Sequence, residues 1–183
     1  MVAIPYRGTS ETLLPAPLQS IPSSNSPSSN LLDTNITVTN VCRKTEYPDQ
    51  CISTVSPFLK GNSDISTILD RTMKSTAWLI KLGSIHSQRL SNAPGKPKDE
   101  IKILKSCKDN YDNALSDFQE AMKALACKDL ERMNSMLKAV LSELEDCRDE
   151  YLGKTFPLTT YDDKVTKMTS NCLAIVDMVH QHH

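Results

Sequence analysis

Residues 107–147 read CKDNYDNALSDFQEAMKALACKDLERMNSMLKAVLSELEDC, and this stretch decides the fold. It begins and ends with a cysteine, and Cys127 lies twenty residues from each end. If the chain turns near Cys127 into two antiparallel helices, Cys107 and Cys147 stand at the same height. At a rise of about 1.5 Å per residue, facing positions at equal height bring two Cα atoms within the ~4.4–6.8 Å that a disulfide needs. The spacing therefore predicts a helical hairpin closed by a Cys107–Cys147 bridge.

Apolar residues recur at every third or fourth position on both sides of this turn, as they do along one face of a helix. The two sets are Ile101, Leu104, Cys107, Tyr111, Ala114, Phe118, Ala121 and Leu125, and then Leu130, Met133, Leu137, Val140, Leu144, Cys147 and Tyr151. Both cysteines belong to these sets, so both face the buried seam. We expect one helix from Asp99 to about Ala126 and the next from about Asp129 to Tyr151.

Working outward, the same periodicity predicts two more long helices. One is capped by Ser63-Asp64, has a seam at Ile65, Leu69, Thr72, Thr76, Leu79 and Gly83, and ends near Leu90. The other runs from about Tyr161 to His180. Because short connections make consecutive helices antiparallel neighbours, the expected fold is all-α: an up-down-up-down four-helix bundle. Residues 36–60 are expected to form an N-terminal helical hairpin ahead of it.

The six cysteines divide into two pairs and two single residues. Cys42 and Cys51 flank the turn at Tyr47-Pro48, so a second disulfide would close the N-terminal hairpin. Cys127 and Cys172 are expected to be free, because roughly 18 Å of helix separates their heights. Two bridges in a domain with its own core indicate an oxidising compartment. Neither resembles a redox centre, which favours a C-x-x-C pair.

Length and composition bound the organisation. A chain of 183 residues suits one domain with its own core. Residues 1–30 are rich in Ser and Pro and lack apolar periodicity, so we expect a disordered leader there and a folded domain at 31–183. The leader shows no signal-peptide pattern of a basic start and an apolar block. A glycosylation sequon at Asn35 nevertheless fits a secreted chain. We give the predicted disulfides more weight than the missing signal peptide, and therefore expect an extracellular protein.

Charge and hydropathy exclude several partners. The chain has 21 basic and 22 acidic residues, a net charge of −1, and no long run of either sign, so nothing favours nucleic acid. The sequence contains no apolar run of eighteen residues, so no membrane-spanning helix is predicted.

Few residues suggest catalysis. The histidines are His86 and a terminal cluster of His180, His182 and His183, which lacks acidic or thiol ligands at helical spacing. No nucleophile elbow, H-E-x-x-H pair or glycine-rich phosphate loop is present. We therefore expect no catalytic residue, no metal and no cofactor, and favour a binding protein over a weak metal or redox enzyme built on the histidine tail and free cysteines.

Four motifs stand in order along the chain: Cys42-x4-Tyr47-Pro48-x2-Cys51, Cys107-x3-Tyr111-Asp112-x-Ala114-x3-Phe118-x2-Ala121, Asp146-Cys147 and Ser170-Asn171-x-Leu173-Ala174-Ile175. Together they resemble the plant invertase and pectin methylesterase inhibitor family over about residues 36–180. The resemblance implies a four-helix bundle with an N-terminal hairpin and two disulfides, which pair the first motif cysteine with the second and the third with the fourth.

The resemblance also implies a function. Members are secreted, non-catalytic proteins that dock one to one on a plant carbohydrate-active enzyme and block its substrate cleft, mainly with the middle helices of the bundle. On this chain that surface is the polar face of the second long helix. The implied partner-binding residues are Asp112, Ser116 and Glu120, flanked by Asp109 and Asn113.

The target remains open between two enzymes. Invertase inhibitors of the family often carry Pro-Lys-Phe, where this chain has Lys128-Asp129-Leu130-Glu131-Arg132, which favours pectin methylesterase over cell-wall or vacuolar acid invertase. Asp146 before the fourth motif cysteine, Cys172 within the Ser-Asn motif and the extra Cys127 depart from the family pattern. A divergent member without an enzyme target therefore stays a third alternative.

Overall fold

The computed structural model describes residues 38–59 and 63–181. The expected leader at 1–30, the sequon at Asn35, and His182 and His183 lie outside these residues. The described part contains helices and no strand. Residues 38–42 are helical, and the elements that follow are α2 (Pro48–Val55), the 3-10 helix η1 (Ser56–Phe58), α3 (Ile65–Ser91), α4 (Lys98–Ala126), α5 (Leu130–Asp149) and α6 (Thr159–Gln181).

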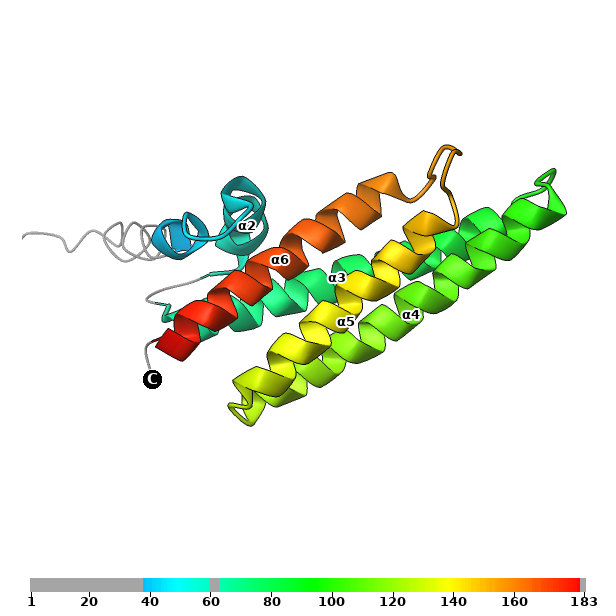
Figure 1. Ribbon diagram of the computed structural model, residues 1–183. Coiled ribbons are helices and arrows are strands. Elements are labelled where there is room, and N and C mark those ends of the chain that lie inside the picture. The colour runs from blue at the N-terminus through cyan, green and yellow to red at the C-terminus, as the bar shows by residue number, and fades with distance from the viewer. Residues whose placement is uncertain (1–37, 60–62, 182–183) are drawn as a thin grey trace, which may run out of the picture.

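The four long helices form an antiparallel bundle in which each packs against two neighbours (Figure 1). α4 and α5 lie side by side along one flank, α3 and α6 along the other, and the N-terminal hairpin with α2 packs against α3 and α6 near one end. This arrangement confirms the four-helix bundle expected from the sequence. Within the described ranges, no helix is both long and apolar enough to cross a bilayer.

Local chemistry fixes where the helices begin. The Asp64 carboxylate accepts a hydrogen bond from the Thr67 N–H at 2.7 Å, and this bond lowers the pKa of Asp64. Asp129 caps α5 in the same way, accepting from the Arg132 N–H at 3.0 Å. Pro48 occupies the first turn of α2, where its missing N–H leaves no bond unmade. The helix starts are therefore encoded locally.

The seam of α4 is buried as expected from Leu104 through Ala121, whereas its outer members, Ile101 and Leu125, are half-buried at the helix ends. The seam of α3 is wider than the predicted line. Met73 and Ile80 are fully buried although they lie outside it, and Leu79, which lies on it, is only half-buried. The reason is that α3 packs against α2, α4 and α6 at once, so a broader arc of its surface meets protein.

Two disulfides tie the fold together. Cys107 and Cys147 join α4 to α5 with a Cα–Cα distance of 4.7 Å, and Cys42 and Cys51 close the hairpin at 5.5 Å. The two remaining cysteines are free. Cys127 is exposed at the α4–α5 turn, while Cys172 is buried and its Sγ lies 4.0 Å from the Thr76 hydroxyl. Burial raises the pKa of the Cys172 thiol to about 12, so it stays protonated.

Asn171 holds the hairpin onto the bundle. Its Oδ1 accepts from the Tyr47 N–H and its Nδ2 donates to the Tyr47 carbonyl, both at 2.9 Å. The Lys167 ammonium lies 5.7 Å from the Tyr47 ring centroid. The amide of the Ser170-Asn171 motif thus satisfies both backbone groups at the hairpin turn.

Tyr111 sets how closely α3 and α4 approach. Its ring lies over Gly83, where a Cβ would stand 2.2 Å from Tyr111 Cε1. The ring is fully buried, and burial raises the pKa of its hydroxyl far above the ordinary value. Gly83 is therefore required by this contact and not by backbone conformation.

A partly buried ion pair joins α5 to α6. Arg148 donates from Nη2 at 2.9 Å and from Nε at 3.0 Å to Oδ2 of Asp162, whose side chain is only 9% exposed. Burial raises the pKa of Asp162, and the positive charge of Arg148 opposes that rise.

Candidate partner-binding surface

The five residues expected to bind a partner all lie on the outward surface of α4, and together they span its width. Asp112 lies at the edge toward α3, Asn113 and Glu120 lie at the edge toward α5, and Asp109 and Ser116 lie between the two edges. The sequence pattern alone does not distinguish these edges. The distinction matters because edge residues contact neighbouring helices, while central ones face solvent.

Asp112 is held by the edge toward α3. Its carboxylate accepts a hydrogen bond from the Ser84 hydroxyl of α3 at 2.5 Å. It also forms an ion pair with Lys108, one turn earlier on α4, at 2.5 Å. Partial burial opposes ionisation of Asp112, but the bonds from Lys108 and Ser84 outweigh it and lower the pKa of Asp112. Asp112 therefore presents a fixed negative charge with few unused acceptor positions.

The edge toward α5 is bridged twice. The Asn113 amide donates to Glu143 at 3.4 Å, and Glu120 accepts from Arg132 at 3.0 Å. Glu120 also forms an ion pair with Lys123 at 2.5 Å. The contact with Lys123, and to a smaller extent that with Arg132, lowers the pKa of Glu120. Both residues are thus positioned by contacts within the protein.

Asp109 and Ser116 are the central, least engaged members. The Asp109 side chain is 77% exposed and approaches Lys108 no closer than 3.9 Å, and Ser116 is exposed. A carboxylate and a hydroxyl with free acceptor positions on a rigid helix are suited to make hydrogen bonds to a partner.

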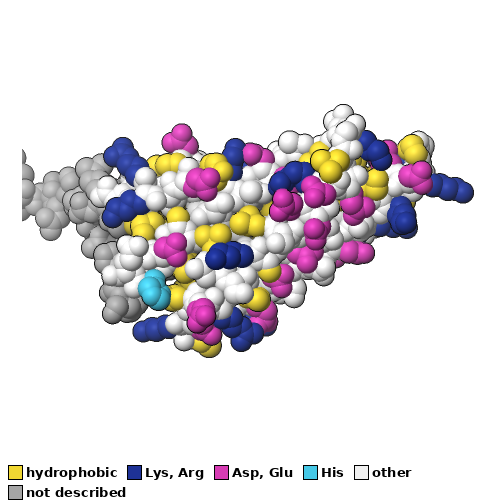
Figure 2. All heavy atoms as spheres, viewed as in Figure 1, with side chains coloured by type: hydrophobic (Ala, Val, Ile, Leu, Met, Phe, Trp, Pro, Cys, Tyr) yellow, Lys and Arg dark blue, Asp and Glu magenta, His cyan; other side chains and the backbone are white. Residues whose placement is uncertain are grey.

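The polar surface of α4 continues onto α5, where the sequence reasoning named no individual residue. Figure 2 shows acidic side chains gathered over the second half of α5 and the adjacent part of α4. The second half of α5 carries the exposed acidic residues Glu145, Asp146 and Asp149. A signal was present in the sequence: the register that pairs Cys107 with Cys147 also places Glu143 opposite Tyr111, about 3 Å along the axis from Asn113. We call the α4 outward surface and this part of α5 the α4–α5 surface.

Asp117 also belongs to the edge toward α5. It is half-buried, no ion pair forms to it among the described residues, and burial raises its pKa. Asp117 is therefore easier to protonate than an ordinary aspartate.

A family model described as plant invertase/pectin methylesterase inhibitor matches residues 37–175, about three quarters of the chain. The chain belongs to the plant invertase/pectin methylesterase inhibitor family. The match covers the hairpin, both disulfides, the α4–α5 surface and most of α6.

Three individual proteins are similar to this family member. Pectinesterase 1 of Arabidopsis thaliana is 26% identical over 162 residues, which make up 76% of this chain and 27% of that protein. The chain thus spans about a quarter of the length of this curated relative. A crystal structure of a mutant form of a pectin methylesterase inhibitor from Arabidopsis superposes with a TM-score of 0.66 at 22% identity, covering 77% of this chain and 95% of that one. A second, of an inhibitor from Arabidopsis thaliana, gives 0.59 at 20% identity, covering 77% and 94%. These two likenesses concern the fold.

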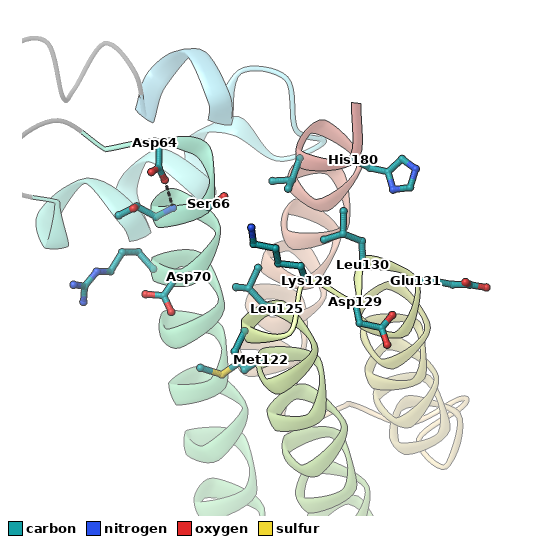
Figure 3. A pocket seen from close by; sticks show the side chains of 14 residues that line it. Asp64, Ser66, Asp70, Met122, Leu125, Lys128, Asp129, Leu130, Glu131 and His180 are labelled. Atoms are coloured by element: carbon teal, nitrogen blue, oxygen red, sulfur yellow. Dashed lines mark hydrogen bonds between the residues drawn. The ribbon is translucent and has the colours of Figure 1, made fainter. Parts of the chain in front are cut away.

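A depression lies at an end of the bundle, away from the middle of α4. It has a volume of about 980 Å³ between the start of α3, the α4–α5 turn and the end of α6 (Figure 3). Met122, Leu125 and Leu130 contribute apolar surface, and Asp64, one of the charged residues at its rim, is engaged in capping α3.

Of the histidines that the sequence offered as candidate catalysts, the two described ones, His86 and His180, lie on different helices. His86 packs against the Tyr161 ring, with centroids 5.1 Å apart, and so joins α3 to α6. His180 is exposed at the rim of the depression. Within 38–59 and 63–181, no three His, Cys, Asp or Glu residues group as metal ligands would.

Proposed function

We propose that this protein is a non-catalytic inhibitor of a plant pectin methylesterase, acting outside the cell in the wall. It docks one to one through the α4–α5 surface and covers the enzyme's pectin-binding cleft. Inhibition then requires no reacting group on the inhibitor, since substrate and inhibitor compete for the same cleft.

Family membership over residues 37–175 is the observation that carries this proposal. The solved structures with this fold include pectin methylesterase inhibitors. The curated relative is a pectinesterase, and this chain covers 27% of its length. The relative favours a pectin methylesterase over an invertase as the target, because about a quarter of a protein named Pectinesterase 1 is similar to this chain.

The α4–α5 surface suits docking because contacts within the protein preorganise it. Cys107–Cys147 fixes the height of α5 against α4, and the Asn113–Glu143 and Glu120–Arg132 contacts hold the edge between them. A preorganised surface loses less conformational freedom on binding, so more of its contact free energy appears as affinity. Asp109 and Ser116 supply acceptors that no other described side chain occupies closely.

Charge on this surface persists in mild acid. Asp112 and Glu120 have lowered pKa values and stay ionised, whereas Asp117, with its raised pKa, takes up a proton first. Contacts that Asp112 and Glu120 make with the enzyme are therefore expected to persist at the mildly acidic pH of a cell wall.

The test is titration of the oxidised protein against a pectin methylesterase and, in parallel, an acid invertase, with residual activity recorded at mildly acidic pH. Esterase activity is expected to fall to a plateau near a one-to-one ratio. Asp109→Lys and Glu143→Lys should each raise the inhibition constant by roughly tenfold or more, as expected for residues central to an interface. Asp177→Lys, which reverses an exposed charge on α6, is the matched control and should leave it unchanged.

Other outcomes distinguish the alternatives. Loss of invertase activity with full esterase activity would assign the protein to the other target of its family. Full activity of both enzymes, with the protein folded and oxidised, would favour a divergent member without an enzyme target. Equal weakening by Asp109→Lys and Asp177→Lys would refute the docking surface while leaving inhibition intact.

A further inference from the structure

The outward face of α3 carries a set of basic residues around an exposed tryptophan, on a different helix from the α4–α5 surface. Residues three, four, seven or eight apart share one side of a helix. On α3 this side presents exposed Arg71, Lys74, Trp78, Lys81, Ile85 and Arg89, which we call the α3 basic face. Burial of the opposite side of α3 against α2, α4 and α6 leaves this side facing solvent.

The positive charge of this face is largely uncompensated. From residue 71 to residue 98 the sequence contains no Asp or Glu. Among the described residues, the single carboxylate in ion-pair contact with the face is Asp70, 2.8 Å from Lys74 at one end. Arg71, Lys81 and Arg89 therefore remain available to pair with anions brought by a ligand.

Trp78 gives the face a second kind of contact. Its side chain is 58% exposed, and the Lys81 ammonium lies 5.9 Å from its ring centroid. An exposed indole offers a flat apolar surface on which another ring can stack, and the adjacent cation can pair with a charge on that ring. A ring that bears a carboxylate satisfies both groups together.

The spacing of the cations indicates a polymer. Arg71 and Arg89 are eighteen residues apart, or roughly 27 Å along the helix axis. A single small anion reaches only one or two of the four basic residues. A chain of sugar rings with a carboxylate on each ring supplies repeated anions along this length as well as rings for stacking.

We propose that the α3 basic face binds de-esterified pectin, a polymer of galacturonate. The basic face is a feature of the structure, while the choice of this polymer rests on the proposed function. That function brings the protein to an enzyme that converts pectin methyl esters to carboxylates. Two disulfides are typical of proteins outside the reducing cytosol, which disfavours nucleic acid as the polyanion. Binding would retain the inhibitor on wall that the esterase has already processed.

The experiment uses the full oxidised chain and no enzyme, so it is independent of inhibition. Trp78 is the only tryptophan in the chain, and its fluorescence reports directly on this face. Titration with an oligogalacturonate long enough to span the face should change the emission saturably, and binding should weaken with added salt. The fully methyl-esterified oligomer should bind at least about tenfold more weakly, because it lacks the carboxylates.

Variants locate the site. Lys81→Glu and Arg89→Glu should each weaken binding by about fivefold or more, whereas Lys138→Glu, which reverses an exposed charge on α5, should change it by less than about twofold. Trp78→Ala, followed by calorimetry, should weaken binding by about tenfold, as loss of an aromatic stacking platform does. Trp78 and the basic residues are exposed, so melting curves should match the wild type.

Three results would overturn the proposal. They are equal binding of the esterified and de-esterified oligomers, equal weakening by Lys138→Glu and Lys81→Glu, and equal affinity and emission change with single-stranded DNA or polyglutamate. Failure of inhibition with retained oligomer binding would instead refute the proposed function alone.

Discussion

Replacement of Gly83 by Ala tests the helix contact on which the α4–α5 surface depends. In an ordinary helix this change is stabilising by about 1 kcal/mol, because Ala has the higher helix propensity. Here the new Cβ would stand 2.2 Å from Cε1 and 2.6 Å from Cδ1 of Tyr111. The two effects have opposite signs, so the sign of the measured change decides between them.

The expected magnitude follows from the geometry. Carbon atoms at optimal contact are about 3.5–4.0 Å apart, so the Tyr111 ring or the helix must move by more than about 1 Å. Tyr111 has no exposed surface, so its movement disturbs packed neighbours. Overpacking of this kind costs about 1–3 kcal/mol. With the propensity gain of about 1 kcal/mol subtracted, Gly83→Ala should lower the free energy of unfolding by up to about 2 kcal/mol.

Thermal and urea unfolding followed by far-UV circular dichroism measure this change. For a protein of this size the expected fall in melting temperature is up to roughly 8 °C. The control is the same substitution in a Tyr111→Val background, which lacks the ring atoms near Gly83. In that background Gly83→Ala should stabilise the protein. A melting temperature of Gly83→Ala at or above that of the wild type, with no coupling between the two substitutions, would refute the close α3–α4 contact.

Three further predictions concern the two disulfides, the N-terminal hairpin and the Arg148–Asp162 ion pair. Replacing Cys107 and Cys147 by Ser should lower the free energy of unfolding by about 4 kcal/mol, and replacing Cys42 and Cys51 by about 2.5 kcal/mol. The first disulfide closes the longer loop, since its cysteines are 40 residues apart and those of the second are 9 apart. A lower urea midpoint for the Cys42 and Cys51 variant than for the Cys107 and Cys147 variant would contradict this. Asn171→Ala removes both hydrogen bonds to Tyr47 and should speed amide hydrogen exchange in residues 38–59 by at least about tenfold without affecting α4; a uniform increase over the whole chain would contradict the local role. Burial raises the pKa of Asp162 above its unfolded value, so ionisation of this carboxyl opposes folding at neutral pH, and that opposition disappears as the pH falls below the folded pKa. The stability of Asp162→Asn relative to wild type should therefore decline between neutral pH and about pH 4, and urea titrations that show a constant or growing difference would contradict the raised pKa.

Much of the fold was predictable because burial along one helix leaves a periodic trace in the sequence. The stripe from Leu104 to Ala121 located the buried side of α4, and the equal spacing of Cys107 and Cys147 about Cys127 gave the register of α4 against α5. The same register would have brought Glu143 to Asn113. The five expected partner-binding residues are therefore placed on the outward side of α4 by periodicity alone.

The remaining features depend on how the helices rotate and tilt against one another. Ser84 binds Asp112 from 28 residues away and Asn171 binds Tyr47 from 124 residues away, and no local pattern specifies such pairs. The wide buried arc of α3 follows from three neighbours packing on it at once, and its basic outward face is recognised only when the rest of its surface is seen to be covered. The sequence by itself determined the helices, their order and the register of the bridged pair, because these follow from residue spacing. Tertiary structure alone decided which polar groups are occupied and which are left for a partner, because that depends on distances between side chains far apart in the chain.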